Sequence, residues 1–259
     1  PVLLSAVVYA LVGAVASVAW AGGGAAAADL AKLRGSRAAP LLVLSVSCYV
    51  VAPYFYFRAL KVLPLSQVAI LQTLMGVFTL LAGVACGAES FSPLRAGGAL
   101  LLVTATALVT AGSESRRYSR TFGLLIFAAA FYAAAALADQ RLVSSIGLSP
   151  ACVLTAAFLP PGLLLAAARL ARGEASRPAL RRALTTRTVY FNAATLGVAY
   201  TAVYLSYAAG ASASGVTLIL AAEVVGVVVG AALFLGERDR LPLRLVSGAL
   251  AALGVYLVR

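Results

Sequence analysis

The sequence contains no histidine, and its three cysteines, Cys48, Cys86 and Cys152, all lie in apolar runs. Without histidine, Ser–His and Cys–His nucleophilic pairs and the commonest metal ligand are excluded. The cysteines lack metal-ligand spacing, so we interpret them as small apolar packing residues. We therefore expect neither a cofactor nor a metal site, and the absences argue against an enzyme.

Charged residues are scarce as well. They make up 11% of the chain, and 63% of its residues are hydrophobic, whereas soluble domains carry roughly 25% charged and about 45–50% apolar residues. A water-soluble globule of this composition would expose large apolar patches. The composition therefore predicts an integral, multi-pass membrane protein, which we expect in the plasma (inner) membrane.

The charges that remain are mostly positive, with 20 Lys and Arg against eight Asp and Glu, a net charge of +12. Such an excess is also typical of nucleic-acid binding. Here, however, the basic residues lie between the apolar runs, as in Arg116–Arg120 and Ala171–Arg187. This pattern is expected of loops that meet anionic lipid headgroups. Membrane lipids, and not nucleic acid, are therefore the expected partners.

Nine continuous apolar runs follow one another along the chain. Each is about 20 residues long, which as a helix spans a hydrocarbon layer of roughly 30 Å. Their continuity excludes the alternating pattern of a membrane β-barrel. We expect an all-α polytopic helix bundle. The runs cover approximately residues 2–20, 40–60, 64–86, 94–112, 121–139, 150–170, 188–207, 213–235 and 241–258.

A repeat relates the two halves of the chain at a spacing of 148–150 residues. Its clearest part aligns Cys86–Thr110 with Leu235–Val258. The matched positions include Pro93-Leu94-Arg95 with Pro242-Leu243-Arg244, and Gly13 with Gly162.

On this alignment, residues 1–112 form a first repeat of four runs, 113–120 a linker, and 121–259 a second repeat of five runs. We expect that the first helix of the first repeat, the partner of run 121–139, is missing from the sequence; a true four-plus-five protein is the alternative. Repeats with an odd number of spans insert with opposite topology, a recurring transporter plan with a site between the repeats.

Two stretches carry a family resemblance. "YFYFRALKVLPLSQVAILQ" (Tyr54–Gln72) and "AAEVVGVVVGAALFLGER" (Ala221–Arg238), with the closing run after it, resemble the drug/metabolite transporter superfamily, specifically its EamA type. The resemblance covers essentially the whole chain except the missing helix. The resemblance implies ten helices in two five-helix repeats and a carrier function. It does not decide whether the cargo is an amino acid, another metabolite, a nucleoside or a drug.

Glu223 lies deep in run 213–235, where many members of that family carry a Glu-Pro pair; here Val224 follows. A carboxylate at the centre of a membrane costs roughly 2.5–3.5 kcal/mol, so we expect it to face the bundle interior. It is either a substrate or proton site or a helix-packing acid. Its repeat partner is Met75, so the repeat itself does not require the acid.

Other polar residues within the runs are candidates for the same cavity. Gln72 and Asn192 lie deep and need partners in the bundle. Tyr200 and Tyr204 are four apart and therefore share a helix face. The complete set of expected substrate-binding residues is Glu223, Gln72, Asn192, Tyr200, Tyr204 and Tyr132.

Four further features have competing interpretations. Asp139, Gln140 and Arg141 form either a gate-side polar cluster or, as we favour, a solvated membrane interface. Trp20 is expected to be an interfacial anchor. Pro160-Pro161-Gly162 should bend or break its helix. We expect the step Gly226–Gly230 to pack closely on a neighbouring helix.

Together these features predict a transporter that moves a small organic metabolite, amino-acid-like or similarly polar, by alternating access. A proton-coupled exporter is one form of this prediction. The expected partners are a small-molecule substrate and membrane lipids, with a homodimer as a further candidate. A non-transporting membrane scaffold, and less readily a lipid-modifying membrane enzyme, are the alternatives.

Overall fold

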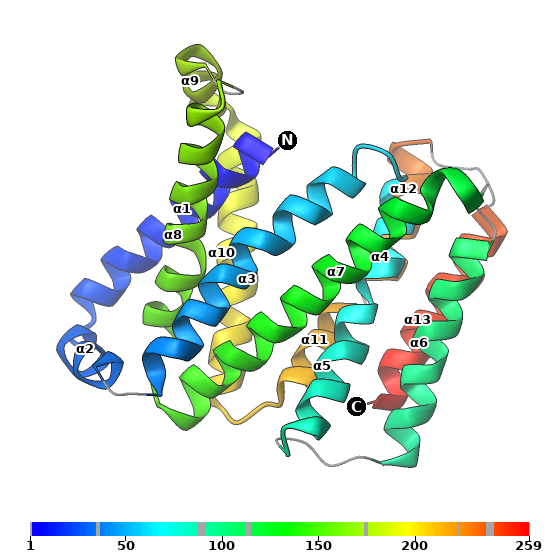
Figure 1. Cartoon of the computed structure of the whole chain (residues 1–259), viewed down its shortest axis with the longest axis horizontal. Coiled ribbons are helices and arrows are strands. Elements are labelled where there is room, and N and C mark those ends of the chain that lie inside the picture. The colour runs from blue at the N-terminus through cyan, green and yellow to red at the C-terminus, as the bar shows by residue number, and fades with distance from the viewer. Residues whose placement is uncertain are drawn as a thin grey trace. The chain divides into compact units, whose positions relative to one another are not determined.

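The computed structural model describes residues 2–34, 37–87, 92–111, 115–173, 176–221, 223–236 and 241–258. Every element in these ranges is a helix (Figure 1), and each of the nine expected runs coincides with a helix or a pair of helices, so the all-α prediction is confirmed. The elements are α1 (Val2–Gly22), α2 (Ala26–Leu33), α3 (Ala38–Ala59), α4 (Leu65–Gln72), α5 (Leu74–Ala85), α6 (Pro93–Ala111), α7 (Ser115–Gln140), η1 (Arg141–Ser145), α8 (Pro150–Ala171), α9 (Arg177–Thr185), α10 (Arg187–Ala208), α11 (Ala213–Ala221), α12 (Val224–Phe234) and α13 (Leu241–Val258).

Five helical stretches within the described ranges are long and apolar enough to cross a membrane. The apolar parts of α6, α12 and α13 are shorter. The five stretches are Leu3–Gly22, Ala38–Ala59, Leu65–Ala85, Thr121–Ser145 and Pro150–Ala171.

The chain divides into two compact units. Unit 1 comprises Pro1–Pro53 and Leu137–Ala211, and unit 2 comprises Tyr54–Ala136 and Ser212–Arg259. Each unit therefore combines segments from both halves of the sequence, whereas the predicted repeats divide the chain at 113–120. Repeat-related helices consequently meet inside each unit.

In unit 1, the repeat-related helices α1 and α8 pack closely against each other; Figure 1 shows them crossing. Gly13 and Gly162, the pair matched in the repeat, lie in this contact. A Cβ atom at Gly13 would overlap the backbone of Leu159, and one at Gly162 would lie 2.5 Å from the backbone nitrogen of Ala10. The repeat alignment thus matched two glycines that let the same two backbones approach each other.

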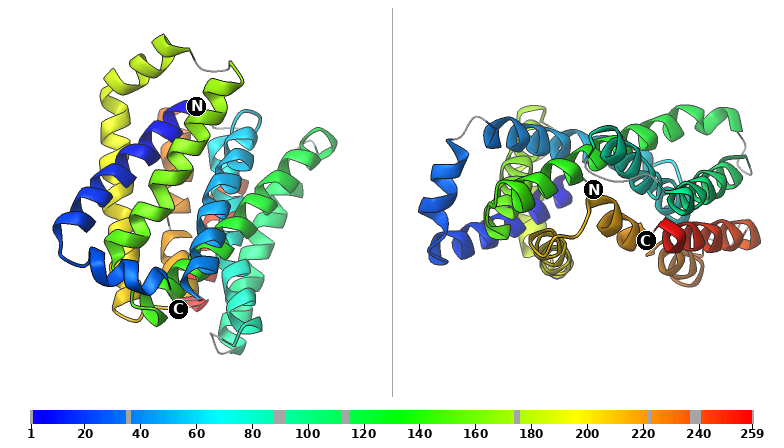
Figure 2. Two further views of the ribbon diagram at one scale, coloured as in Figure 1. Left: turned by 60° about the vertical axis from the view of Figure 1, so that its left-hand side comes forward. Right: turned by 90° about the horizontal axis from the view of Figure 1, so that it is seen from below.

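Two short helices of unit 1, α2 and α9, form in segments that were expected to be polar connections between the apolar runs. α9 runs into α10 at an angle (Figure 2). Its Leu180 and Ala183 pack against Val7 and Val8 of α1. The apolar side of this basic helix is thereby covered by the start of the chain.

In unit 2, the repeat-related helices α6 and α13 pack side by side (Figure 1). A Cβ at Gly254 of α13 would lie 2.7 Å from the carbonyl oxygen of Gly98 in α6. α7 packs on the end of α3 and on α4, where Phe122 and Leu125 are buried in one cluster with Ala59 and Leu71.

The helix breaks of unit 2 differ from the expectation. Runs 64–86 and 213–235 are each divided into two helices, at Thr73 and just before Val224, although no proline stands there. Conversely, α8 continues through Pro160 and Pro161, so the run is not broken there; a bend, the other expected outcome, stays a prediction. Membrane helices tolerate proline because neighbouring groups satisfy the backbone that it leaves open.

Candidate functional site

Unit 1 encloses a carboxylate at the end of α7. The side chain of Asp139 is only 1% exposed. It accepts hydrogen bonds from three hydroxyls: Ser45 at 2.5 Å and Tyr49 at 2.9 Å, both on α3, and Tyr204 on α10 at 2.8 Å. These four residues, the Asp139 cluster, join three helices through one acid. The favoured interpretation of Asp139 as a solvated interfacial group is therefore wrong.

Aromatic rings surround the Asp139 cluster. Phe158 of α8 is fully buried, with its ring centroid 5.8 Å from Tyr49 and 4.7 Å from Tyr200. Tyr200 lies 6.2 Å from Tyr204. Tyr200 and Tyr204 share a helix face, as expected, and Tyr204 donates a hydrogen bond to the Asp139 carboxylate. Water is excluded from the carboxylate, so its charge depends on the three hydroxyls.

The chain changes its helical pitch immediately after Asp139. Residues Arg141–Ser145 form a π-helix that ends before Gly147, whose φ is +73°. Gln140 donates from Nε2 to the carbonyl oxygen of Ala211 at 3.3 Å. π-Helical turns are rare and frequently lie at functional sites. The π-helix therefore marks the segment beside the buried acid as a candidate functional region.

A second buried acid, Asp29 on α2, was missed by the sequence analysis. It is 2% exposed and accepts from Trp20 Nε1 at 2.9 Å, from the backbone nitrogen of Ser149 at 3.2 Å, and from the Ser149 hydroxyl. Lys32 donates to the carbonyl oxygen of Gly147. We call Asp29, Trp20 and Ser149 the Asp29 clasp. Trp20 therefore anchors the turn after α1 to the start of α8.

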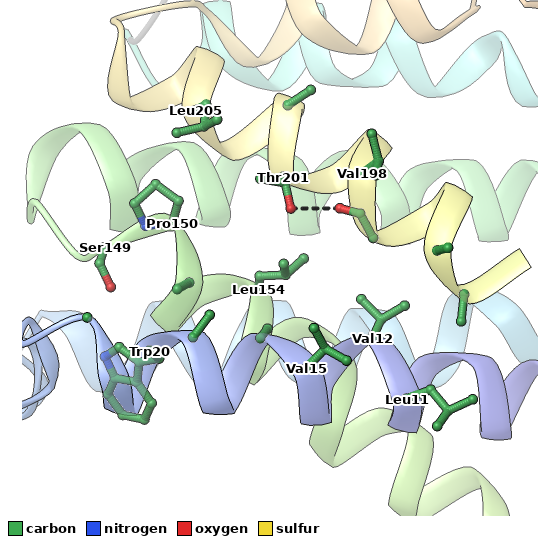
Figure 3. A pocket seen from close by; sticks show the side chains of 18 of the residues that line it. Leu11, Val12, Val15, Trp20, Ser149, Pro150, Leu154, Val198, Thr201 and Leu205 are labelled. Atoms are coloured by element: carbon green, nitrogen blue, oxygen red, sulfur yellow. Dashed lines mark hydrogen bonds between the residues drawn. The ribbon is translucent and has the colours of Figure 1, made fainter. Parts of the chain in front are cut away.

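An apolar cavity of about 1060 Å³ lies beside the clasp, between α1, α8 and α10 (Figure 3). Trp20, Ser149 and Pro150 stand at one end, and Leu11 lies at the other. Thr201 is one of its few polar lining residues, and its hydroxyl is already bonded to the carbonyl oxygen of Gly197 at 2.7 Å. The cavity offers shape and apolar surface but almost no groups that would orient a polar ligand.

Glu223 belongs to unit 2, where it stands at the break before α12. Its side chain is exposed on the unit, so the expectation that it faces an enclosed interior is not met within unit 2. Among the described residues, its carboxylate has neither a hydrogen bond nor an ion pair. Its role as a site residue stays a prediction.

Gln72 stands at the corresponding break in the first half, as the last residue of α4. Its Oε1 atom is buried and has no hydrogen-bond partner among the described residues. The structure thus places two of the predicted site residues, Gln72 and Glu223, at the two helix breaks of unit 2.

The remaining predicted site residues are not gathered with these. Asn192 is exposed on α10 in unit 1, and Tyr132 is half-buried on α7 in unit 2. Cβ atoms at Gly226 and Gly230 would meet nothing within 4 Å, so the close packing expected of this step is not found in unit 2. Cys86 is exposed, whereas Cys48 and Cys152 are buried as expected.

No group of three His, Cys, Asp or Glu side chains that could hold a metal ion occurs in the described part of the chain. Unit 1 holds two enclosed carboxylates, Asp139 and Asp29, and an apolar cavity. Unit 2 holds the exposed carboxylate of Glu223 and the unpaired amide oxygen of Gln72.

Comparisons with known proteins agree with the helical architecture. A solved crystal structure, described only as that of a "protein", covers 99% of this chain over 86% of its own length with a TM-score of 0.70 and 18% identity. At that identity the likeness shows the fold alone. No curated protein matches. The model of the EamA-like transporter family matches residues 1–111. The chain is thus an integral membrane protein whose residues 1–111 are similar to the EamA-like transporter family.

Proposed function

We propose that this protein carries a small polar organic metabolite, amino-acid-like in size, across the plasma membrane by alternating access, with proton coupling at Asp139. The family match makes a carrier the first hypothesis. The observation that carries the proposal further is the Asp139 cluster, a carboxylate enclosed within the spanning stretch Thr121–Ser145. Ionisable groups inside membrane spans are expensive and usually functional.

The cluster suits a switch between two arrangements. One carboxylate holds α3, α7 and α10 together through Ser45, Tyr49 and Tyr204. Adding a proton to Asp139 removes the negative charge that makes these hydrogen bonds strong, since bonds to an ionised acceptor are roughly twice as strong as neutral ones. The titratable side chains that face the acid are Cys48, Tyr49 and Tyr204. Weakened bonds would free the three helices to move against one another.

The repeat-related packing supports the same proposal. α1 meets α8 and α6 meets α13, each within its own unit. Transporters of this plan move one set of helices against another around a fixed site.

The proposal is tested by measuring solute flux into proteoliposomes that contain the full-length protein. Wild type and Asp139→Asn would face labelled amino acids, nucleosides and cationic drugs, each with and without a pH gradient. We expect saturable wild-type flux that responds to the gradient, and a folded Asp139→Asn protein whose flux no longer does.

Ser144→Ala is the matched control, because Ser144 is exposed on the following π-helix and bonds only to the carbonyl oxygen of Gln140. It should behave as wild type. If the flux through Asp139→Asn still responded to the pH gradient as wild type does, Asp139 would not be the site of proton coupling. A folded wild type that moves none of the cargoes would favour the scaffold alternative.

A further inference from the structure

A basic helix lies at the end of unit 1 where two of its spanning stretches reach the membrane surface. The stretch of α1 begins at Leu3, and that of α8 ends at Ala171. α9 follows α8 in the chain and contacts the start of α1 (Figure 1). Because the apolar stretches of α1 and α8 begin and end here, α9 lies at the level where hydrocarbon gives way to lipid headgroups.

The apolar side of α9 is already covered by protein. Its Leu180 and Ala183 pack against the valines near the start of α1, and Ala183 is buried. Arg181 and Arg182 are exposed. A basic amphipathic helix at a membrane surface usually buries its apolar face among the lipids. Here the protein holds the helix in place, and the arginines are left for another partner.

The end of α9 is closed by hydroxyl groups. The carbonyl oxygen of Arg182 accepts from the Thr186 hydroxyl at 2.7 Å, and that of Leu184 accepts from the Tyr190 hydroxyl at 2.7 Å. Within the described ranges, the guanidinium groups of Arg181 and Arg182 have neither a hydrogen bond nor an ion pair. A guanidinium carries five N–H donors and no acceptor. These donors therefore face outward, toward an acceptor that the chain does not supply.

A pocket of about 440 Å³ lies between α9 and the start of α1. Arg182 and Thr186 line it on one side, and Leu3 and Leu4 of α1 line it on the other. Leu4 is 43% exposed although it stands at the start of a spanning stretch. The pocket thus combines a cation and a hydroxyl with two leucines at the membrane boundary. A ligand that fills it should have an anionic head joined to an apolar chain.

We propose that this pocket binds the headgroup of an anionic phospholipid. Arg182 binds a phosphate oxygen, Arg181 adds a second positive charge beside it, and the two leucines contact the first methylenes of the acyl chains. Guanidinium and phosphate are matched in charge and in bidentate geometry. The segment Ala171–Arg187 carries five arginines and a single glutamate, so its net charge favours an anionic lipid. The proposal does not depend on the transport function.

The pocket's two kinds of lining exclude simpler occupants. A free phosphate or another small anion would satisfy Arg182 and leave Leu3 and Leu4 without apolar contact. A neutral lipid would cover the leucines and leave the guanidinium without an acceptor. An anionic phospholipid satisfies both sides at once, and a bilayer supplies it at the depth where the pocket lies.

The opposite end of α1 provides a control. α2 follows the last turn of α1, and its Lys32 donates to the carbonyl oxygen of Gly147 within the protein. Arg34 and Arg37 are exposed at this end. α1 rises about 1.5 Å per residue, so its two ends lie about 30 Å apart. Removing these two charges therefore matches the loss of Arg181 and Arg182 at the other surface of the membrane.

Four probes separate the head from the chains. Dioleoylphosphatidylglycerol has an anionic head and chains, dioleoylphosphatidylcholine has a zwitterionic head, dioleoylglycerol has no phosphate, and glycerol phosphate has no chains. Each would be added to the full-length protein in detergent. Native mass spectrometry counts the molecules bound, and the thermal midpoint reports stabilisation. We expect phosphatidylglycerol to bind saturably and at least roughly tenfold more tightly than each of the other three.

Variants assign this preference to the pocket. Arg181→Gln with Arg182→Gln should weaken phosphatidylglycerol at least roughly tenfold, to the level of phosphatidylcholine. Arg181→Lys with Arg182→Lys keeps both charges and should retain most of the preference, which separates loss of charge from loss of folding. Arg34→Gln with Arg37→Gln should bind phosphatidylglycerol as wild type does.

Four results overturn the proposal. The first is a wild type that binds phosphatidylglycerol no more tightly than phosphatidylcholine, and the second is a glutamine variant of α9 that keeps the preference. The third is an equal loss in Arg34→Gln with Arg37→Gln, which would show a general attraction of the charged surface. The fourth is glycerol phosphate binding as tightly as the lipid, which would make the pocket a site for soluble anions.

Discussion

Unit 1 and unit 2 each hold one carboxylate in an apolar run, and the two acids have opposite surroundings. Asp139 in unit 1 is 1% exposed and accepts three hydroxyl hydrogen bonds. Glu223 in unit 2 is exposed and has no partner in the described residues. A satisfied acid fixes the helices around it, whereas an unsatisfied one is available to a ligand. The comparison separates a carboxylate that joins three helices from one that has no structural partner in the described residues.

The glycines of α1 and α8 differ in packing from those of α12. Gly13 and Gly162 in unit 1 let α1 and α8 touch through their backbones, whereas Cβ atoms at Gly226 and Gly230 on α12 would meet nothing within 4 Å in unit 2. Unit 2 has a close backbone contact of its own at Gly254 and Gly98, so the difference concerns these two pairs of glycines and not the units as a whole. Four substitutions test how far this difference extends, from the most damaging to the least.

Gly13→Leu should have the largest effect. A side chain there overlaps the backbone of Leu159, which cannot move aside as a flexible side chain would. Overpacking of a close contact usually costs about 1–3 kcal/mol, and a backbone clash lies at or beyond the upper end. We expect little folded protein by fluorescence-detected size exclusion. Gly226→Leu is the control and should elute as wild type. Equal behaviour of the two variants would contradict the packing difference.

Asp139→Ala should be the next most damaging. It leaves the hydroxyls of Ser45, Tyr49 and Tyr204 without their acceptor, and each unsatisfied buried group costs about 1–3 kcal/mol. The thermal midpoint should therefore fall well below that of Tyr204→Phe, which removes a single bond. If Tyr204→Phe were as harmful as Asp139→Ala, the acid would not be the centre of the cluster.

Asp29→Ala should have an intermediate effect with a specific optical signal. It releases Trp20, the single tryptophan of the chain, and opens the Asp29 clasp at the start of α8. The lost hydrogen bonds should cost about 1–3 kcal/mol. We expect the tryptophan emission to shift, because the indole N–H loses its carboxylate partner. An unchanged spectrum together with an unchanged midpoint would show that the clasp does not hold the turn.

The sequence was sufficient for the nine apolar helical runs, and the repeat matched two glycines that lie in one helix contact. Hydropathy located each of the nine runs, and the repeat matched Gly13 with Gly162 before their contact was known. Both signals are carried by residue type at regular spacing. They succeed because a membrane span must be long, apolar and internally hydrogen-bonded wherever it occurs.

The site was harder to predict, because its features depend on partners distant in sequence. Asp139 was interpreted as interfacial since it ends a run beside Gln140 and Arg141, and nothing local reveals that Ser45 and Tyr204 enclose it. The break at Thr73 lacks a proline signal, whereas Pro160-Pro161 suggested a break that α8 does not have. Hydropathy reports how apolar a helix is, and not whether its hydrogen bonds reach back three residues or four.

Glu223→Ala should have the smallest effect on stability. A side chain without partners leaves nothing unsatisfied when it is removed, and substitutions of this kind usually change the free energy of unfolding by less than about 0.5 kcal/mol. The thermal midpoint should therefore match that of wild type. A large fall in the midpoint would show instead that Glu223 packs against a neighbour. Because Asp139→Ala should lower the midpoint well below that of wild type, the two variants measured together decide whether Asp139 stabilises the helices around it and Glu223 does not.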